Sequence, residues 1–158
     1  SLCTVARATE LVGEPWTLMI LREMFLRSRR FDELRKYTGA SPHLLSQRLK
    51  RMEAEGIVTR RRYQERPPRD EYRLTEKGRD LWPVVMALKS WGDKWRDPDG
   101  IDPVLVVHKG CGKVTRPVLV CSECGEPMEA HDARVEIDPA FAHERDGRLK
   151  KHQGKGTP

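Results

Sequence analysis

The stretch from Ile57 to Gly78, IVTRRRYQERPPRDEYRLTEKG, constrains the fold more than any other part of the chain. It opens with β-branched residues, which suit a strand. Its Pro67-Pro68 pair belongs in a turn, because proline cannot donate to a sheet ladder. The return segment 71–75 alternates polar and apolar residues, as a half-buried strand does. The stretch therefore predicts a β-hairpin with a stiff tip. Thr75 can cap a helix that follows, although Gly78 in its first turn weakens that signal.

The predicted hairpin is strongly basic. It carries the arginines Arg60, Arg61, Arg62, Arg66, Arg69 and Arg73. Residues 1–97 hold 21 basic and 14 acidic residues, whereas residues 98–158 hold 9 and 10, so the net charge of +6 belongs to the first part. A stiff ribbon with this charge suits the phosphate backbone of nucleic acid. A solvated basic face without a partner is the alternative.

The segments before the hairpin predict successive helices. Apolar residues recur at helical spacing over 5–12, 15–25 and 31–37. Ser41 then caps another helix, with Pro42 at its first position, and Gly56 ends it. A short helix, a turn, a capped helix and a hairpin make a helix-turn-helix followed by a wing. An ordinary helical hairpin with a charged exterior is the alternative.

The capped helix should read DNA bases. Its apolar stripe of Leu44, Leu45, Leu49 and Met52 would dock on the core and leave polar side chains on the other faces. Gln can bond adenine, Arg can bond guanine, and Ser or His can bond base edges or phosphate. The candidate recognition residues are Ser41, Pro42, His43, Ser46, Gln47, Arg48, Lys50 and Arg51, and the candidate wing contacts are Arg60, Arg62, Arg66 and Arg69. Arg73, on the return strand, is expected to be structural.

A long helix over 75–95 follows, with a kink or break near Pro83. It has more apolar surface than a domain of about 95 residues covers easily. We therefore expect a homodimer interface, whose candidates are Leu81, Trp82, Val85, Leu88, Trp91 and Trp95. The alternatives are that these side chains pack on the domain's own core, or that the tryptophans line a pocket for a small-molecule effector.

A small β-like module follows a linker at 96–100. It reads His108-x2-Cys111-Gly, nine residues, then Cys121-x2-Cys124-Gly, and each pair has the spacing of a zinc knuckle. Strands at 104–107 and 118–120 would complete a zinc-ribbon-like fold. These four side chains would fill a tetrahedral Zn²⁺ site, so the metal would be structural. The alternatives are a metal-free ribbon, a Cys121–Cys124 redox pair, or His131 as a substitute ligand.

The sequence thus predicts an α+β chain in three parts: a winged helix-turn-helix domain for DNA binding and dimerisation at 1–97, the zinc-ribbon-like module at 98–138, and a polar, flexible tail at 139–158. No apolar run approaches the ~18 residues of a membrane span, and no secretory signal is visible. We expect a cytoplasmic protein without a membrane partner. No nucleophile–base pair, phosphate-binding glycine loop or carboxylate pair indicates an enzyme.

Several motifs resemble the HxlR family of bacterial transcription regulators, which is related to the MarR group. They are found at 3–7, 12–23, 30–34, 45–49, 67–72 and 74–78. The resemblance covers about residues 3–95 and implies a winged-helix homodimer, joined by its terminal helices, that controls nearby promoters. It also implies that 41–51 enters the major groove while the wing, with Arg66 and Arg69 at its tip, flanks the minor groove.

Several members of that family sense oxidants or electrophiles through a cysteine at the position of Cys3. The resemblance therefore makes Cys3 a redox-sensing candidate, and Arg7 one turn on could lower its pKa. A small, inert cysteine is the alternative.

The expected function is a transcriptional regulator, a repressor, that binds a palindromic operator in double-stranded DNA as a homodimer. A small molecule or an oxidant would be its effector. One alternative is an adaptor that uses the winged helix and ribbon for protein contacts. Another is a thiol-responsive form of the same regulator. An enzyme that uses the cysteine module is disfavoured, because four ligands leave no open metal position.

Overall fold

A computed structural model describes residues 1–96, 99–101 and 103–153 of the chain. Two compact units are present, one of Val12–Pro117 and the other of Ser1–Leu11 with Val118–Pro158. Each unit is described by itself. The boundary between them falls inside the segment 98–138, for which the sequence predicts one module. Residues 97 and 98 of the predicted linker lie outside the described residues.

The helical core of the first unit is built from α2 (Pro15–Phe25), α3 (Phe31–Thr38) and α4 (Pro42–Ala54). These helices lie where the apolar spacing predicts them. The side chains that they bury almost completely are Ile20, Leu21, Leu34, Leu45, Leu49 and Met52. Burial of one such side chain contributes about 1.5–3 kcal/mol. The apolar stripe of α4 is therefore what holds this helix on the unit.

The ends of these helices follow from local chemistry. The Ser41 hydroxyl accepts a hydrogen bond from the backbone N–H of Leu44 at 3.3 Å, which caps α4 as predicted. Pro42 occupies the first position, where its missing N–H costs little. Gly39 closes α3 with a φ of 74°, a left-handed conformation that glycine adopts without strain. The turn between α3 and α4 is consequently short and well defined.

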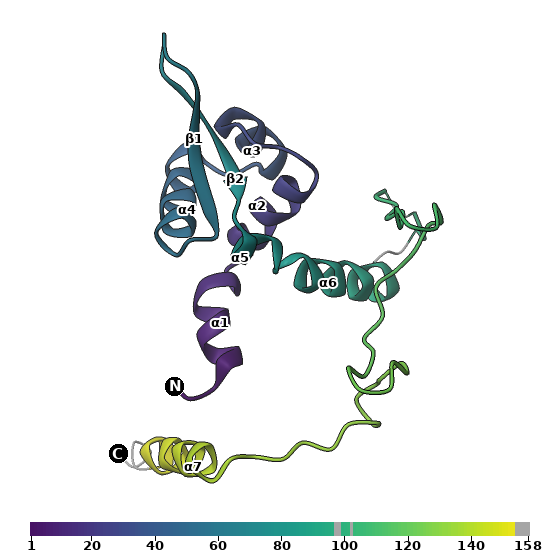
Figure 1. Ribbon diagram of the computed structural model, residues 1–158. Coiled ribbons are helices and arrows are strands. Elements are labelled where there is room, and N and C mark those ends of the chain that lie inside the picture. The colour runs from purple at the N-terminus through teal and green to yellow at the C-terminus, as the bar shows by residue number, and fades with distance from the viewer. Residues whose placement is uncertain (97–98, 102, 154–158) are drawn as a thin grey trace. The chain divides into compact units, whose positions relative to one another are not determined.

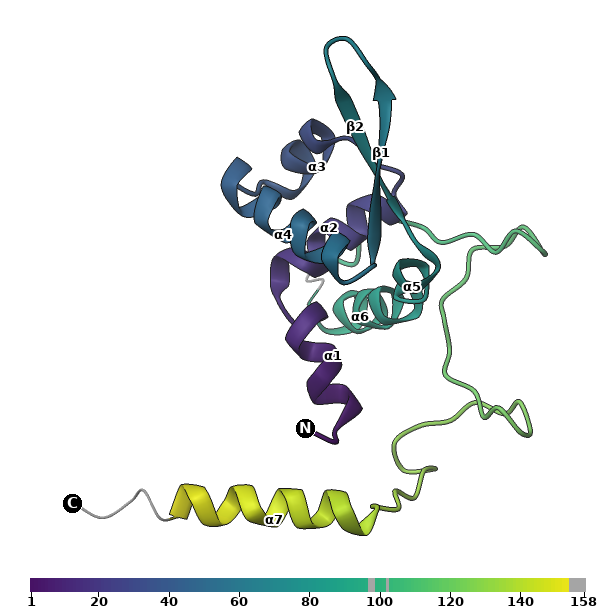
Figure 2. The same ribbon diagram turned by 60° about the vertical axis from the view of Figure 1, so that its left-hand side comes forward.

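The predicted wing is an antiparallel pair of strands, β1 (Val58–Gln64) and β2 (Arg69–Leu74). Val58 pairs with Leu74 at its base, and the register shifts between Arg62 and Gln64 near the tip. In both ribbon views the hairpin extends beyond the three helices (Figures 1 and 2). Its base is tied to the α2–α3 loop, because the Tyr72 N–H donates to the Arg29 carbonyl at 2.8 Å.

The predicted break near Pro83 is confirmed: α5 (Glu76–Arg79) and α6 (Trp82–Trp95) replace one continuous helix. Proline near the start of α6 removes an N–H donor that a longer helix would need. Thr75 caps α5 by accepting a hydrogen bond from the Gly78 N–H at 3.1 Å. In the ribbon, α6 leads away from the base of the wing and packs beside α2 (Figure 1).

The second unit contains most of α1 (Thr4–Val12) and all of α7 (Pro139–Gln153). The sequence predicts a flexible tail over 139–158, whereas residues 139–153 form a helix; residues 154–158 lie outside the described residues. Although polar, this segment is rich in Ala, Leu, Glu, Lys and Arg, which are good helix formers. Asp138 accepts a hydrogen bond from the Ala140 N–H at 2.8 Å, and Arg148 pairs with Glu144.

The strands predicted at 104–107 and 118–120 do not form. In the described part of 104–137 the only β pairings are two isolated bridges, Val107 to Val114 and Val120 to Pro127. Prolines at 103, 117 and 127 limit any longer ladder, because they cannot donate. The segment consists of two short hairpins rather than a ribbon sheet. Within the described residues, no helix is long and apolar enough to cross a membrane.

Candidate nucleic-acid interface

The two faces of α4 differ sharply. Leu45, Leu49 and Met52 are buried, whereas His43, Gln47 and Lys50 are exposed. The exposed three follow one another at spacings of four and three residues, which places them on a single face. Arg51 is also exposed and lies beside that face. Because α4 presents polar side chains opposite its buried stripe, it can enter a groove without disturbing the core.

The start of α4 suits a phosphate. Ser41 and Pro42 are exposed, and Ser46 is half-buried one turn on. The positive end of the helix dipole and free backbone N–H groups gather at such a terminus. The Ser41 hydroxyl is engaged in the N-cap hydrogen bond, so the first role of Ser41 in the site is to start the helix.

Arg48 differs from the other predicted recognition residues. Its guanidinium forms an ion pair with the Glu14 carboxylate at 2.8 Å, and the two side chains are only 23% and 28% exposed. The same carboxylate caps α2, accepting a hydrogen bond from the Thr17 N–H at 3.3 Å. Arg48 therefore lies against the beginning of α2 and ties α4 to it. The structure gives it a positioning contact rather than a place on the exposed face.

The wing arginines are of two kinds. Arg62 pairs with Asp70 at 3.1 Å and with Glu65 at 3.9 Å. Arg60 lies 3.8 Å from Glu53 of α4 and 4.0 Å from Asp70. These carboxylates partly neutralise both arginines and brace the hairpin. Two of the four predicted wing contacts are therefore already engaged within the chain.

The other kind of wing arginine has no such partner. Arg66 and Arg69 are exposed at the tip, and neither forms an ion pair within the described part of the chain. The same holds for Arg61, which the sequence-based choice of contacts missed. Its cross-strand neighbour Glu71 binds Arg73 instead, at 2.6 Å. Glu71 lies opposite Arg61 in the pairing register and two residues before Arg73 on β2, so one carboxylate is shared between two candidate partners.

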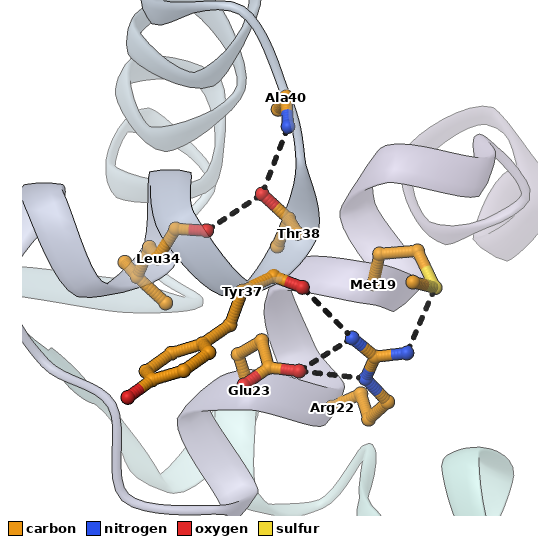
Figure 3. A network of polar contacts seen from close by, with 7 residues as sticks. All are labelled: Met19, Arg22, Glu23, Leu34, Tyr37, Thr38 and Ala40. Carbon is orange, nitrogen blue, oxygen red and sulfur yellow. Dashed lines mark hydrogen bonds and ion pairs between the residues drawn. The ribbon is translucent and has the colours of Figure 1, made fainter.

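A polar network holds the turn that leads into α4 (Figure 3). The Glu23 side chain is 8% exposed and accepts two hydrogen bonds from Arg22, at 2.8 and 2.5 Å. Arg22 also donates to the Tyr37 carbonyl at 3.4 Å. The Thr38 hydroxyl donates to the Leu34 carbonyl at 2.6 Å and accepts from the Ala40 N–H at 3.2 Å. The network links α2 to the last turn of α3 and so orients α4.

The start of α3 is held by a carboxylate. Glu33 accepts hydrogen bonds from the backbone N–H groups of Arg29 and Arg30, both at 3.0 Å. These bonds lower the pKa of Glu33 below its ordinary value, and the charge of Arg30 adds to the effect. Because the Arg29 carbonyl binds β2, the same carboxylate also supports the base of the wing.

The predicted dimer residues divide between the core and the surface. Trp82 packs on Phe25 with ring centroids 5.8 Å apart, Val85 is buried and Leu81 is half-buried. Leu88, Trp91 and Trp95 are 51%, 57% and 63% exposed. Val84, which the sequence-based choice missed, is 47% exposed and falls in line with them at helical spacing.

A cavity of about 550 Å³ lies between α2, α6 and residues 103–106. Most of the side chains that line it are apolar, including Leu18, Phe25, Trp82 and Met86. Arg22 also lines the cavity. Of the three tryptophans for which the sequence predicts a pocket, only Trp82 is among the described lining residues.

The cysteines lie outside this interface. All four are free of disulfides. Cys3 is half-buried at the start of α1, where its sulfur accepts a hydrogen bond from the Ala6 N–H at 3.4 Å. Backbone and side-chain hydrogen bonds from Cys124 and Glu123 lower the pKa of Cys121. Among the described residues, no group of three or more His, Cys, Asp or Glu side chains is gathered closely enough to hold a metal ion.

Comparison with known proteins agrees with this architecture. The family model of the HxlR-like helix-turn-helix matches residues 11–100. The uncharacterized HTH-type transcriptional regulator Rv3095 of Mycobacterium tuberculosis is 43% identical over 139 residues, which cover 87% of each chain. The regulator YdeP of Bacillus subtilis, also called uncharacterized, is 35% identical over 113 residues, covering 71% of this chain and 87% of YdeP.

Solved structures resemble the chain as well. The crystal structure of PA1607, described as a candidate transcription factor, aligns with a TM-score of 0.76 and 31% identity, covering 87% of this chain and 96% of PA1607. The redox regulator HypR in its oxidized form aligns with a TM-score of 0.56 and 36% identity, covering 60% of this chain and 99% of HypR.

Proposed function

The chain belongs to the HxlR-like helix-turn-helix family of transcriptional regulators, and we propose that it is a repressor that binds a palindromic operator as a homodimer. One observation carries the DNA-binding part. The exposed polar face of α4 and the unpaired arginines of the wing belong to the same basic unit, opposite its buried core. A DNA duplex offers both a groove for such a helix and phosphates for such a wing.

In this proposal α4 and the wing have different roles in DNA binding. His43, Gln47 and Lys50 lie on the face of α4 that would enter the major groove, so base reading belongs there. Arg66 and Arg69 at the wing tip would contact phosphates or the minor groove, which supplies affinity with little sequence choice. Arg48 would act indirectly, by holding α4 against Glu14.

Selection of bound sequences from a random duplex pool, followed by footprinting, tests this proposal. We expect a palindrome with half-sites about 10 base pairs apart, or a multiple of that spacing. Gln47→Ala should change the preferred bases, because it removes a base-reading amide. Arg48→Ala, the neighbouring control, should lower stability and leave the base preference unchanged. If no sequence were enriched, or if the selected sequence lacked two-fold symmetry, the result would count against a dimeric repressor.

The salt dependence of binding tests the wing. Each phosphate contact steepens the fall of log K with log salt by about 0.9. Arg69→Ala should therefore reduce the slope by about that amount on every sequence. Arg62→Ala is the matched control, and its effect should be smaller because Asp70 already neutralises Arg62. If the wild type bound DNA weakly and without preference for the operator sequence, a protein adaptor would be favoured instead.

The homodimer part of the proposal rests on α6. Val84, Leu88, Trp91 and Trp95 form one exposed apolar stripe with alternating spacings of four, three and four residues. This is the repeat by which two helices pack side by side. A second copy of the chain would cover the stripe and set the two α4 helices into successive half-sites.

A small-molecule effector is a further part of the proposal. The cavity of about 550 Å³ has a size typical of ligand sites. Arg22 lines it and also donates to the Tyr37 carbonyl, so an apolar ligand with a polar end could act on the turn before α4. A ligand that occupies it should raise the melting temperature of the wild type. Leu18→Trp, which would fill the cavity, should abolish that rise; an equal rise would place the ligand elsewhere.

An oxidant is the second effector candidate, and Cys3 is its site. The similar protein HypR is described as a redox regulator, and Cys3 of this chain is half-buried at a helix start, within reach of oxidants. Diamide or peroxide should weaken operator binding by the wild type. Cys3→Ser should make the affinity insensitive to either reagent. An equal loss of affinity in both proteins would exclude Cys3 as the sensor.

A further inference from the structure

Two ion pairs lie in the wall of the cavity between α2, α6 and residues 103–106, one on each helix. Arg22 and Glu23 come from α2, and the guanidinium donates to the carboxylate at 2.8 and 2.5 Å. Lys89 and Asp93 come from α6 and pair at 2.7 Å. Every other described residue that lines the cavity is apolar. Both cations of the wall therefore already bind a carboxylate of the chain.

Glu23 differs from the other three charged residues in its burial. Its side chain is 8% exposed, against 42% for Arg22, 21% for Lys89 and 42% for Asp93. A carboxylate that is withdrawn from water this far is stable only where hydrogen bonds replace its hydration. Glu23 is therefore the charged residue of the wall that gains most from a partner inside the cavity.

Only one oxygen of the Glu23 carboxylate is engaged. Both hydrogen bonds from Arg22 end on Oε1 (Figure 3), and no group of the described residues donates to Oε2. Each carboxylate oxygen can accept about two hydrogen bonds. Glu23 thus brings to the cavity wall an acceptor that has no donor within the described part of the chain.

Arg22 has little left to offer an anion. Its Nε and one terminal nitrogen bind Glu23, and that terminal nitrogen also donates to the Tyr37 carbonyl at 3.4 Å. The other terminal nitrogen donates to the Met19 sulfur at 3.6 Å. A ligand carboxylate would have to displace Glu23 from Arg22 and leave a buried charge unpaired, which is strongly unfavourable.

Aromatic rings line the same cavity. Phe25 of α2 and Trp82 of α6 have ring centroids 5.8 Å apart. The face of an aromatic ring carries partial negative charge, so it attracts cations and repels anions. Flat apolar rings also pack well against such side chains. The lining therefore favours a flat apolar molecule that carries a positive charge.

We propose that the ligand of this cavity is an apolar, ring-bearing amine whose ammonium group donates to Oε2 of Glu23. The inference rests on the small-molecule effector of the proposed function and adds its chemical class. A bound ammonium shares the carboxylate with Arg22 and so weakens the ion pair that holds Arg22 near the Tyr37 carbonyl. The charge of the ligand is thereby coupled to the turn that leads into α4.

Calorimetric titration of the DNA-free full chain with three matched probes tests the charge preference. Naphthylmethylamine is a cation at neutral pH, naphthylmethanol is neutral and naphthoic acid is an anion, whereas the ring system is the same. The amine should bind at least about tenfold more tightly than the other two, because hydrogen bonds between charged groups are the stronger ones. Equal affinity for the acid, or no binding of the amine, would overturn the proposal.

Two variants locate the ammonium group. Glu23→Gln keeps the shape of the side chain and removes its charge, so the affinity for the amine should fall about tenfold, while that for the alcohol changes less than roughly threefold. Asp32→Asn is the control, because it removes a negative charge from the exposed surface of α3, and it should leave all three affinities unchanged. A preference for the amine that persists in Glu23→Gln would overturn the assignment.

A variant that fills the cavity keeps the test decisive if Glu23→Gln does not fold, which far-ultraviolet circular dichroism reveals. Leu18→Trp should bind none of the three probes, because its side chain would occupy the space of the ring. Binding of the amine with the affinity of the wild type would place the ligand elsewhere and overturn the assignment.

Operator binding is measured separately, so that the ligand class and the effector role fail in different ways. In anisotropy titrations with the selected operator, saturating naphthylmethylamine should change the dissociation constant of the wild type and leave that of Leu18→Trp unchanged. If the wild type prefers the amine but binds the operator equally with and without it, the ligand class is supported and the effector role is contradicted. If the operator is bound but the amine is not preferred, the ligand class is wrong and the DNA-binding proposal stands.

Discussion

Gly78 shows how a single residue can depend on a distant part of the chain. A Cβ at this position would lie 2.2 Å from the carbonyl oxygen of Ile57, at the base of the wing. Glycine therefore lets α5 lie directly against the residue that precedes β1. From the sequence alone, Gly78 only weakens a helix start; its tertiary contact gives the reason for it.

Replacement of Gly78 tests this close approach. Gly78→Ala should lower the free energy of unfolding by about 1–3 kcal/mol, because backbone must move to admit the methyl group. Gly92→Ala in α6 is the control: its Cβ meets nothing within 4 Å. The free energy of unfolding of that variant should rise by roughly 0.5–1 kcal/mol, because alanine has a higher helix propensity than glycine. Urea unfolding measures both, and effects of the same sign would contradict the steric explanation.

At the scale of elements, α3 is fixed by side-chain hydrogen bonds at both of its ends. Its start is fixed by Glu33 on the backbone of Arg29 and Arg30, and its end by Arg22 on the Tyr37 carbonyl. Neither contact touches the exposed face of α4. Both set the direction of α4, because only the short turn of residues 39–41 separates the two helices.

The pH dependence of stability tests the cap of α3. The folded pKa of Glu33 is lower than its ordinary value of 4.5, so the cap contributes fully above that pH and is lost as the pH falls through the lowered folded pKa. Glu33→Ala should lose about 1 kcal/mol of unfolding free energy at neutral pH. The difference from wild type should shrink in acid. Asp32→Ala serves as the control, and a deficit in Glu33→Ala that is independent of pH would contradict the ionised cap.

At the scale of the whole molecule, the main feature is the apolar stripe of α6, which remains exposed within the unit Val12–Pro117. Trp82 and Val85 turn inward, toward α2, whereas Leu88, Trp91 and Trp95 remain exposed. A helix with apolar residues on both sides is typical of one that is covered by a partner. The proposed operator symmetry depends on this partner being a second copy.

Disruption of the stripe tests the homodimer. Trp91→Asp should weaken self-association by about 2 kcal/mol or more, roughly a thirtyfold rise in the dissociation constant, because it places a charge in an apolar interface. Tyr37→Asp is the control, since Tyr37 is 53% exposed but lies on α3. Light scattering coupled to size-exclusion chromatography gives the mass of each variant. A monomeric wild type would contradict the proposal at once.

Much of the fold of Val12–Pro117 could be predicted, because its signals are local. Ser41 with Pro42 starts α4, Gly39 and Gly56 end helices, and Pro67-Pro68 marks the tip of the wing. Each of these depends on residues within one turn of its own position. The tail is also explained by local composition: its polar residues suggest flexibility, whereas the intrinsic helix propensity of 139–153 favours α7.

The residues of the candidate site were predictable only in part. Helical spacing was sufficient to put His43, Gln47 and Lys50 on one face of α4. It could not separate Arg48, bound to Glu14, from its neighbours.

The sequence by itself determined the order of the elements, their caps and the basic charge of the first part, because these depend on neighbours along the chain. Only the tertiary structure decided which arginines are neutralised, why Gly78 must be glycine, and which residues of α6 stay exposed. The physical reason is that ion pairs, steric contacts and burial join residues far apart in the chain, and no local pattern records their partners.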